Sequence, residues 1–583
     1  MAIKARDWLD RIEKAEKKLS QWRKNGERIV KRYRGADDSG ESSVQLNIHW
    51  SNIQHYLSTV YARTPKPEVI QRLRSTPDPM AQNLSEILQD AVSFAIDSYD
   101  FDEVVEAALI DYGNAGLGQI RIRYKPYFRT VGKERIPVGF SEDIQDGKIV
   151  LKFYLDDGER VDDADVKTDE QGPFIDGDPI EEIAYEEVCP EFVAWDRFGW
   201  DTDAKVWPDV NWCYIRHCMS EQQVKKQFGR KASSVEFDHG DTINKMAMVY
   251  EVFDKAGRKV FFVTKGPEDA ILDLGDPYKL EGFFPFPKPL LATTTSDKLV
   301  PVPLFAIVQD LYYELDEVQA RIKSIVRQLK VRGAFDASKG DELRNILGKE
   351  DGYLFPIEQW SEHMERSGLK GAIDFIPLEM LYGTLQTLQN HRTTLMQLIQ
   401  QITGITDASQ GNTRASESAA ASRIKNEYMS SRINREVKKV SRFLRDLFRL
   451  IAEMQAEKFS AATFSEITGR QIDDTMLESI RSDMSRAYKI DVLSDSMLIQ
   501  DEDAEVERRS KSLGAMSQWT QAITPLVQSG QLNPEAAKAM LLWVVSADAR
   551  GRELSKHIAQ INFAPAPPAD PMAGAEAGMQ PPQ

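Results

Sequence analysis

The sequence predicts an α+β protein, and three observations lead to that fold class. Short runs in the first half alternate apolar and charged residues, which is the period of a half-buried strand. Long runs in the second half repeat apolar residues every three or four positions, which is the period of a helix. The length of 583 residues, of which 42% are hydrophobic and 28% charged, is typical of a globular protein with several domains.

The first part of the chain is expected to be mainly helical. A basic amphipathic arm covers about Ile3–Arg34, and a second helix covers Asn47–Arg63 before "TPKPEV" forces an extended chain. A third helix is expected from about Met80 to Tyr112. The "GNAGLGQ" that follows (Gly113–Gln119) is read as a helix C-cap and tight turn, because it precedes a strand instead of following one as a dinucleotide-binding loop would.

Strands are expected next, with a helical layer packed against them. The alternating runs are Gln119–Lys125, Lys148–Leu155, Met248–Asp254 and Arg258–Thr264.

From Pro301 onward the pattern becomes that of long helices. Apolar residues at spacings of three and four predict a helix of roughly 40 Å, then a compact insert with a strand at "YLFPI", then a second helix. A third helix of roughly 65–70 Å follows a polar loop. A further helical group at about Asp501–Gln560 precedes a Pro/Ala/Gly-rich tail, for which we predict disorder.

The charge is acidic overall and unevenly distributed. A net charge of −17 argues against a tight, sequence-independent DNA binder, because such proteins neutralise phosphates with a basic face. Met1–Arg34 nevertheless holds twelve Lys and Arg against five acids, whereas Asp156–Glu191 holds fifteen acids against two basic residues. Both stretches fit a solvated surface. The sharper alternative is that the basic arm docks on an acidic partner, such as a neighbouring copy of the chain.

No pattern of residues predicts catalysis, a metal or a cofactor. A phosphate-binding GxxxxGK[ST] loop is absent from the sequence. Cys213, His217 and Cys218 lie close together without a second ligand pair, so we interpret the cysteines as buried and structural. His49 and His55 are interpreted as packing or interface residues. The acids of the loop-like segment 156–191 have no ordered metal-ligand spacing.

The cysteine count and the hydropathy indicate the cellular compartment. Three scattered cysteines cannot form a disulfide framework, and the charged first residues do not form a signal peptide. No apolar run approaches the roughly 20 residues needed to cross a bilayer. We therefore expect an intracellular, reduced protein with no membrane partner.

Five stretches stand out in order along the chain: "NIHWSNIQHYLSTVYARTPKPEVIQR", "DYGNAGLGQIRIRY", "FVAWDRFGWDTDAKVWPDVNWCYIRHCMSEQQVKKQFG", "GFFPFPKPLLATTTSDKLVPVPLFAIVQDLYYELDEVQARI" and "ITGITDASQGNTRASESAAASRIKNEYMSSRI". They resemble stretches of the portal proteins of tailed bacteriophages, which form a ring at one capsid vertex. None of these stretches is a chemical signature by itself, and together they span most of the chain.

The resemblance implies a multidomain subunit of a ring. Its parts would be an N-terminal arm and α+β wing (1–300), a first stem helix (301–330), a small α/β clip (331–376), a second stem helix (377–402), a tunnel loop (403–413), a long wing helix with closing wing strands (414–500), a helical crown (501–562) and a disordered tail (563–583).

The function implied is that of a non-enzymatic DNA channel. Double-stranded DNA would be packaged and ejected through a ring that has twelve copies in the virion, and the packaging ATPase would be a separate chain. Partners implied are the terminase large subunit, the major capsid and scaffolding proteins, and the head-tail adaptor proteins. The locations implied are the capsid portal vertex and, during assembly, the host cytoplasm.

Residues that would face DNA belong to the tunnel loop, which is polar and poor in basic residues. They are Asp407, Ser409, Gln410, Asn412, Thr413 and Arg414. Such a lining contacts phosphates without holding them by counterion release, so that DNA can slide. Without the resemblance, 403–413 would be an ordinary interhelical connection.

Basic residues at the end of the first stem helix form a second candidate group. They are Arg321, Lys323, Arg327, Lys330 and Arg332, which would face either the channel or acids of an adjacent subunit.

Two alternatives of other classes stay open. One is a metal-dependent, nuclease-like head protein that uses the acidic segment, and the other is a helical interaction scaffold with no role on DNA. Cleavage lost on changing Asp162, Asp163 and Asp165 would favour the first alternative, and monomers or dimers would favour the second.

Overall fold

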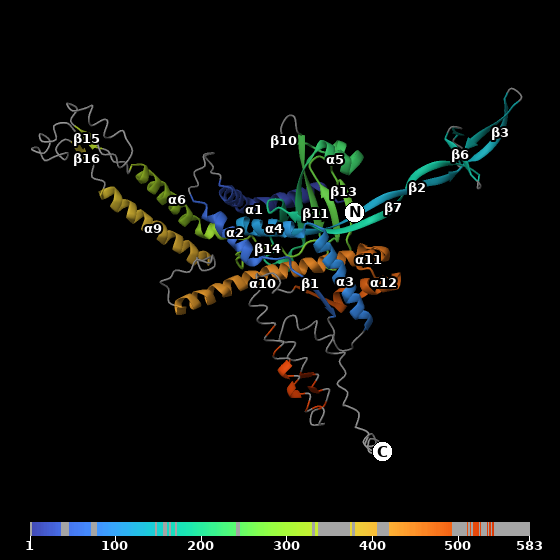
Figure 1. Ribbon diagram of the computed structural model, residues 1–583. Coiled ribbons are helices and arrows are strands. Elements are labelled where there is room, and N and C mark those ends of the chain that lie inside the picture. The colour runs from blue at the N-terminus through green and yellow to red at the C-terminus, as the bar shows by residue number, and fades with distance from the viewer. Residues whose placement is uncertain are drawn as a thin grey trace, which may run out of the picture. The chain divides into compact units, whose positions relative to one another are not determined.

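The structure is a computed structural model (Figure 1). It describes residues 3–35, 46–71, 79–145, 148–155, 160–162, 165–169, 172–240, 245–328, 333–335, 373–375, 379–404 and 419–492, with scattered positions between 510 and 540. The chain divides into two compact units, the first made of 1–61 and 67–492 and the second of 62–66 and 493–583. The first unit contains every strand described and is a mixed α+β structure, which confirms the predicted fold class at that level.

The helices described in the first unit are α1 (Ala5–Tyr33), α2 (Ile48–Val60), α3 (Pro79–Ser98), α4 (Phe101–Ala115), α5 (Glu221–Phe228), α6 (Leu304–Gln328), α9 (Glu379–Thr403), α10 (Ala419–Lys458), α11 (Ala461–Thr468) and α12 (Asp474–Ala487), with short 3-10 turns at Trp207–Asp209 and Gly229–Ser234. The strands are β1 (Pro67–Gln71), β2 (Leu117–Pro137), β3 (Gly139–Gln145), β4 (Lys148–Tyr154), β5 (Arg160–Val161), β6 (Val166–Asp169), β7 (Gly172–Val193), β8 (Phe198–Trp200), β9 (Trp212–Ser220), β10 (His239–Gly240), β11 (Lys245–Asp254), β12 (Lys259–Val263), β13 (Leu272–Gly275), β14 (Leu290–Leu291), β15 (Gly333–Phe335), β16 (Ile373–Phe375) and β17 (Tyr488–Val492).

The N-terminal helix α1 covers one face of a six-stranded antiparallel sheet, whose main order is β13-β12-β11-β9-β8. Ile12 and Ala15 of the helix pack against Tyr214, Val252 and Phe261 of the sheet, and all of these side chains are buried. The opposite face of the sheet is covered by α5. The first half of the basic arm is therefore anchored by its apolar stripe, which leaves its charged residues on the outside.

Further along α1, the helix is fixed to the start of β2. The indole Nε1 of Trp22 donates a hydrogen bond to the carbonyl oxygen of Ala115 at 2.8 Å. The ring of Trp22 also meets those of Trp195 and Trp200 edge-on, with centroids 5.4 and 5.9 Å apart. Gly116 ends α4 with φ of 83°, and its N–H donates to the carbonyl of Tyr112 at 3.0 Å, so the predicted C-cap is confirmed.

Strands β2 and β7 form a long antiparallel ribbon inside a four-stranded sheet of order β14-β2-β7-β6. The first residues of β2, Leu117–Ile122, are buried. Farther along, every residue of Tyr127–Glu134 on β2 and of Asp178–Tyr185 on β7 is exposed. We call these sixteen residues the exposed ribbon. Figure 1 shows it continuing beyond the helices that cover the base of the two strands.

The base of the ribbon is anchored to α10 and α11. The carboxylate of Glu186 is 2% exposed and accepts hydrogen bonds from the backbone N–H of Ser460, from the hydroxyl of Thr463 and from the hydroxyl of Tyr124, at 2.7–3.1 Å. Helix α10 has 40 residues and is about 60 Å long. It also packs on α3 and α4, where Phe448 meets Phe101.

Helices α6 and α9 pack side by side and both lead to the short β15–β16 pair. Their shared core includes Leu315, Val318, Leu395 and Ile399. These helices match the predicted ones at 301–330 and 377–402 within three residues at each end, and α10 lies within the range 414–500 predicted for the long third helix and the strands after it. The predicted strand at "YLFPI" lies outside the described residues.

Three expectations are wrong. The predicted helix from Met80 to Tyr112 is two helices, because Tyr99 and Asp100 leave the helical path between α3 and α4. The acidic segment is not loop-like, since β7 occupies its second half. Cys218 is exposed, although Cys213 is buried as expected. In the second unit, the described positions between 510 and 540 are helical except Asn533, and most of the predicted helical group there lies outside the described residues.

Candidate functional site

The α6–α9 pair is the first element of the candidate site. Polar contacts join the exposed sides of the two helices: the ring of His391 lies 2.9 Å from the carboxylate of Glu314, and Arg392 donates to the amide oxygen of Gln319 at 3.3 Å. At the base of the pair, the side-chain amide of Asn52 on α2 donates a hydrogen bond to the hydroxyl of Tyr312 on α6 at 2.9 Å. The pair is therefore fixed where it joins the rest of the unit.

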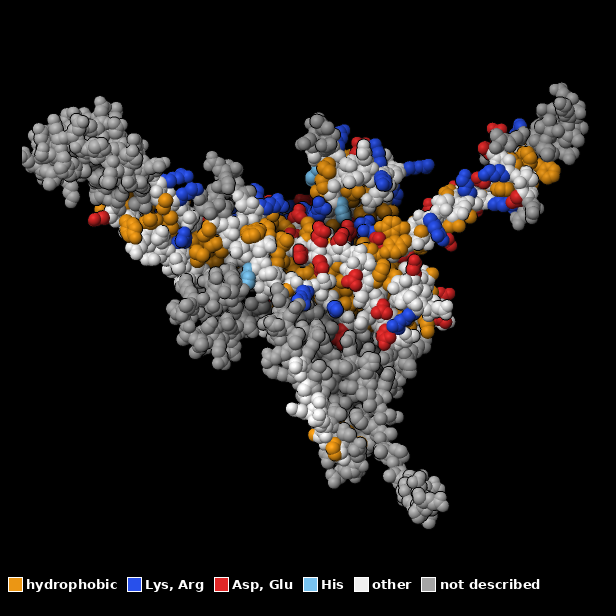
Figure 2. Space-filling view, viewed as in Figure 1, with side chains coloured by type: hydrophobic (Ala, Val, Ile, Leu, Met, Phe, Trp, Pro, Cys, Tyr) orange, Lys and Arg blue, Asp and Glu red, His pale blue; other side chains and the backbone are white. Residues whose placement is uncertain are grey.

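The candidate basic residues on α6 are exposed where the structure describes them. Arg321 forms an ion pair with Glu317 of the same helix at 2.9 Å, and Lys323 and Arg327 lie farther along. Figure 2 shows Lys and Arg side chains grouped toward that end of α6. Lys330 and Arg332 lie outside the described residues.

Helix α9 ends at the point where the tunnel loop was predicted to begin. The Thr403 hydroxyl donates to the carbonyl of Ile399 at 2.8 Å, and the N–H of Gly404 donates to that of Gln400 at 2.8 Å. Gly404 has φ of 80°, which turns the chain away from the helix axis. The predicted DNA-facing residues Asp407, Ser409, Gln410, Asn412, Thr413 and Arg414 all lie outside the described residues.

A cavity of about 350 Å³ lies beside this junction. It is lined by residues from α2, α4, α6, α10 and the end of α9, including Thr403 and Gly404. One wall is polar, because the carboxylate of Glu436 accepts hydrogen bonds from the Tyr112 hydroxyl at 2.7 Å and from the Lys439 ammonium at 2.9 Å. Burial, together with Tyr56 and Glu436, raises the pKa of Tyr112, so its hydroxyl remains a donor. The polar cluster therefore ties α4 to α10.

His49 has the packing role that the sequence predicted. Its ring is buried, and Nε2 lies 2.9 Å from the side-chain oxygen of Asn114. Burial lowers the pKa of His49 to about 4, although the contact with Asn114 acts in the opposite direction. The ring is thus neutral at physiological pH and joins α2 to α4. Burial also lowers the pKa of His55.

Those residues weighed as metal or nuclease ligands that the structure describes do not converge. Among the residues that the structure describes, no group of three or more His, Cys, Asp and Glu side chains could hold a metal ion. Cys213 is buried, which raises the pKa of its thiol. His217 instead contacts Glu251, and the thiol of Cys218 lies 3.7 Å from the sulfur of Met246.

Two acids of strand β7, one in the exposed ribbon and one just beyond it, are paired with basic residues across the strands. Ion pairs join Glu182 to Arg129 at 3.4 Å and Asp176 to Lys133 at 3.2 Å. Asp162 and Asp165 are exposed, whereas Asp163 lies outside the described residues.

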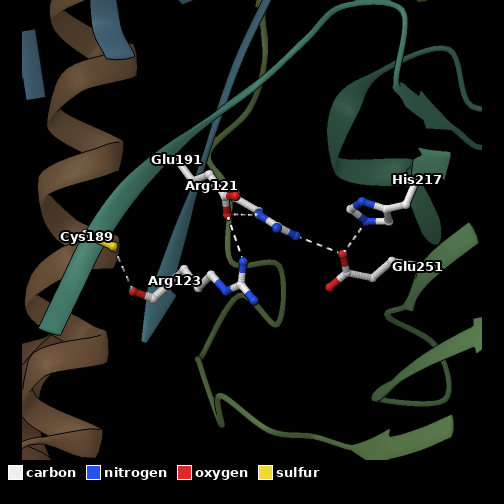
Figure 3. Close-up of polar contacts among 6 residues, drawn as sticks. All are labelled: Arg121, Arg123, Cys189, Glu191, His217 and Glu251. Carbon is white, nitrogen blue, oxygen red and sulfur yellow. Dashed lines mark hydrogen bonds and ion pairs between the residues drawn. The ribbon is translucent and has the colours of Figure 1, made fainter. Parts of the chain in front are cut away.

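A buried ionic cluster, which the sequence analysis missed, joins the ribbon to the six-stranded sheet (Figure 3). The Arg121 guanidinium on β2 contacts Glu191 of β7 at 2.7 Å and Glu251 of β11 at 2.8 Å. Glu251 also lies 2.9 Å from His217, and Arg123 contacts Glu191 at 3.6 Å. These residues are far apart in the sequence, and the only signal was the presence of charges in strands that are otherwise apolar.

Burial raises the pKa of Glu251, but the contacts with His217 and Arg121 outweigh it and hold the pKa below its ordinary value. Burial also raises the pKa of Glu191, but its contacts with Arg121 outweigh it and hold that pKa below its ordinary value. Both carboxylates are therefore charged, and with the guanidinium they tie the base of the ribbon to the six-stranded sheet.

Comparison with models of known protein families finds no match, and a search of curated proteins finds none either. In the part of the chain that the structure describes, none of the helices combines the length and the apolar character that a membrane span requires.

Proposed function

We propose that this chain is a portal-type subunit. Copies of it would form a ring at one capsid vertex, through which double-stranded DNA is packaged by a separate motor and later ejected. The observation that carries the proposal is an order of elements: α6, a small insert with the β15–β16 pair, α9, a junction, and then the 40-residue α10. Stem helix, clip, stem helix, tunnel loop and long wing helix is the order that the sequence resemblance implies.

Exposed apolar side chains on the α6–α9 pair support assembly with other copies. Large apolar residues of the two helices are 40–83% exposed: Ile307, Tyr313, Val326, Met380, Tyr382, Leu398 and Ile402. A helix pair that buries one apolar face internally and exposes others is typical of an element that packs against further helices. In a ring, adjacent stems would supply those helices.

The channel lining stays a prediction from the sequence. Asp407, Ser409, Gln410, Asn412 and Thr413 would contact passing phosphates through hydrogen bonds, and Arg414 would supply a single positive charge. The net charge of −17 would also let DNA slide, because it weakly repels DNA over a Debye length of about 8 Å. The exposed Arg321, Lys323 and Arg327 would either line the channel or contact acids on the adjacent stem.

Solution mass and particle shape test the proposal together. Twelve copies of a 66.1 kDa chain weigh about 0.8 MDa, and a closed cyclic assembly gives end-on rings in negative stain. Light scattering at that mass with ring-shaped particles is the expected result. Monomers or dimers over the whole accessible concentration range would contradict the ring.

A cleavage assay tests the alternative that the protein is a nuclease. Plasmid DNA incubated with the protein and Mg²⁺ or Mn²⁺ should stay intact. Metal-dependent cleavage that disappears in an Asp162→Ala/Asp163→Ala/Asp165→Ala variant would overturn the non-enzymatic proposal, and the Glu466→Ala/Glu478→Ala variant, changed at two exposed acids of α11 and α12, serves as the matched control.

A further inference from the structure

The exposed ribbon carries an unusual amount of uncovered apolar surface. Six of its sixteen residues are large apolar side chains, each 38–59% exposed: Tyr127, Phe128, Val131, Ile180, Ile183 and Tyr185. They occupy both faces, since Phe128 pairs with Ile183 across the strands while Tyr127 pairs with Tyr185. A two-stranded ribbon alone in water is marginally stable, and such a surface marks an interaction site.

The chemistry of the ribbon favours a cationic partner. Strand β7 contributes the acids Asp178, Glu181 and Glu182, and β2 contributes Glu134 with the basic residues Arg129 and Lys133. The exposed ribbon therefore has four acids against two basic residues, and Glu182 is paired with Arg129. Elsewhere along these two strands, cations already lie over aromatic rings: Lys458 lies 5.8 Å from the centre of the Tyr124 ring, and Arg135 lies 4.9 Å from that of Phe174. An excess of acids close to exposed aromatic rings attracts Lys and Arg through ion pairs and cation–π contacts.

Helix α1 presents such a cationic surface, rich in Lys and Arg. A stripe of exposed residues runs along it at spacings of three and four, and five of its six members are basic: Lys14, Lys17, Gln21, Lys24, Arg28 and Lys31. A shallow hollow of about 290 Å³ lies over the last four of these together with Asn25 and Glu27. We call the stripe, from Lys14 to Lys31 and without Asn25 and Glu27, the basic stripe.

The two surfaces also match in length. The basic stripe spans seventeen residue steps of helix, or about 26 Å. The exposed ribbon has eight residues on each strand, or about 25 Å. The long stems of Lys and Arg can cover apolar side chains while their charged ends meet carboxylates.

We propose that the exposed ribbon of one copy of this chain docks on the basic stripe of a second copy. A second copy is required because the centre of the stripe is fixed at the base of the ribbon, where Trp22 bonds to Ala115 just before β2 begins. Tyr127 lies ten residues farther along β2, about 33 Å away along the strand. Ribbon and stripe are different surfaces, so the contact is heterologous and its repetition generates a closed ring or an open chain of copies.

This inference depends on the proposed function only for the number of copies in the ring. Charge reversal tests the contact itself. Asp178→Lys/Glu181→Lys changes the ribbon, and Lys14→Glu/Lys24→Glu changes the stripe. Each pair should raise the concentration needed for half-assembly by about tenfold or more at low salt, because like charges would face each other. The chain with all four changes should recover assembly. Glu466→Lys/Glu478→Lys makes the same change in charge at exposed acids of α11 and α12, and should assemble like the unaltered protein.

A photoreactive benzoylphenylalanine in place of Phe128 locates the contact directly. In a mixture of ¹⁴N- and ¹⁵N-labelled copies, we expect crosslinked peptides that join the ribbon of one label to α1 of the other. Crosslinks only within one label, or to other segments, would overturn the proposal.

Failure of the ribbon contact and failure of the ring have different signatures. Intact rings in both the ribbon pair (Asp178→Lys/Glu181→Lys) and the stripe pair (Lys14→Glu/Lys24→Glu), at the concentration that the unaltered protein needs, would overturn the ribbon contact and leave the ring. Monomers without intermolecular crosslinks would overturn both. DNA retention that depends on Lys14 and Lys24, without a crosslink to α1, would assign the stripe to nucleic acid instead and would also overturn the proposal.

Discussion

Replacing Arg121 with methionine should destabilise the first unit strongly. The side chain of Arg121 is 11% exposed and that of Glu251 is 8% exposed, and their ion pair measures 2.8 Å. Methionine keeps the apolar stem but removes the charge, which leaves the buried carboxylate of Glu251 with His217 alone. Removing one partner of a buried ion pair costs about 3–5 kcal/mol, because the remaining charge stays out of water.

A double-mutant cycle separates this cost from lost packing. Glu251→Met alone leaves Arg121 with Glu191, whereas Arg121→Met/Glu251→Met replaces the pair by apolar groups and should recover most of the loss. The assay is urea unfolding followed by tryptophan fluorescence, since Trp195 and Trp200 are buried. An Arg121→Met protein within about 1 kcal/mol of the unaltered one, or a double variant no more stable than Arg121→Met, would refute the reasoning.

The same pair should affect acid unfolding. The folded-state pKa of Glu251 is held below its ordinary value of 4.5, so its stabilising contribution is complete above pH 4.5 and is lost as the pH falls through the folded-state pKa. Arg121→Met removes one cause of that lowering. Loss of structure on acidification should therefore begin at a higher pH in the variant, and an unchanged midpoint would contradict the assignment.

Three further predictions concern stability. A Cβ added at Gly118 would lie 2.3 Å from a backbone oxygen of α4, so Gly118→Ala should cost about 1–3 kcal/mol in urea unfolding, whereas Gly132→Ala on the exposed ribbon meets nothing within 4 Å and should be nearly neutral. Phe448→Ala empties a fully buried site and should cost about 3–5 kcal/mol, against little change for Met380→Ala at a side chain that is 83% exposed, and equal effects would contradict the described core. Because the pKa of His49 is about 4 when folded and 6.5 when unfolded, stability should fall by up to about 3 kcal/mol as the pH drops between those values, and His49→Gln should lack that part of the pH dependence.

Sequence patterns predicted the long helices well because one physical signal dominates in them. In α1, α6, α9 and α10, apolar residues recur at spacings of three and four over 25 or more residues, so the buried face is unambiguous. The break between α3 and α4 was missed because apolar residues continue across it. Ile96 and Phe101 are both buried although the chain leaves the helix between them.

The ribbon was underestimated because its exposed part has no alternation to detect. Tyr127 and Phe128 are adjacent and point to opposite faces, and both are exposed, so the period-two pattern ends while the strand pairing continues. The ionic cluster of Arg121 and the Tyr112–Glu436 contact were missed for another reason. Their members come together only through the tertiary fold, and no local pattern records that Tyr112 of α4 faces Glu436 of α10.

The pairing of β1 with β17 has a consequence for synthesis of the chain. Pro67 lies opposite Val492, so this small sheet closes a loop of roughly 400 residues. At about 5–20 residues per second, a ribosome takes about 20–80 s to make that stretch. Throughout this time β1 has emerged without its partner strand, and its backbone N–H and C=O groups are available to other strands. Strand β1 of each nascent chain is therefore open to mispairing for this time, and premature release before residue 492 should yield fragments in which β1 stays unpaired with β17.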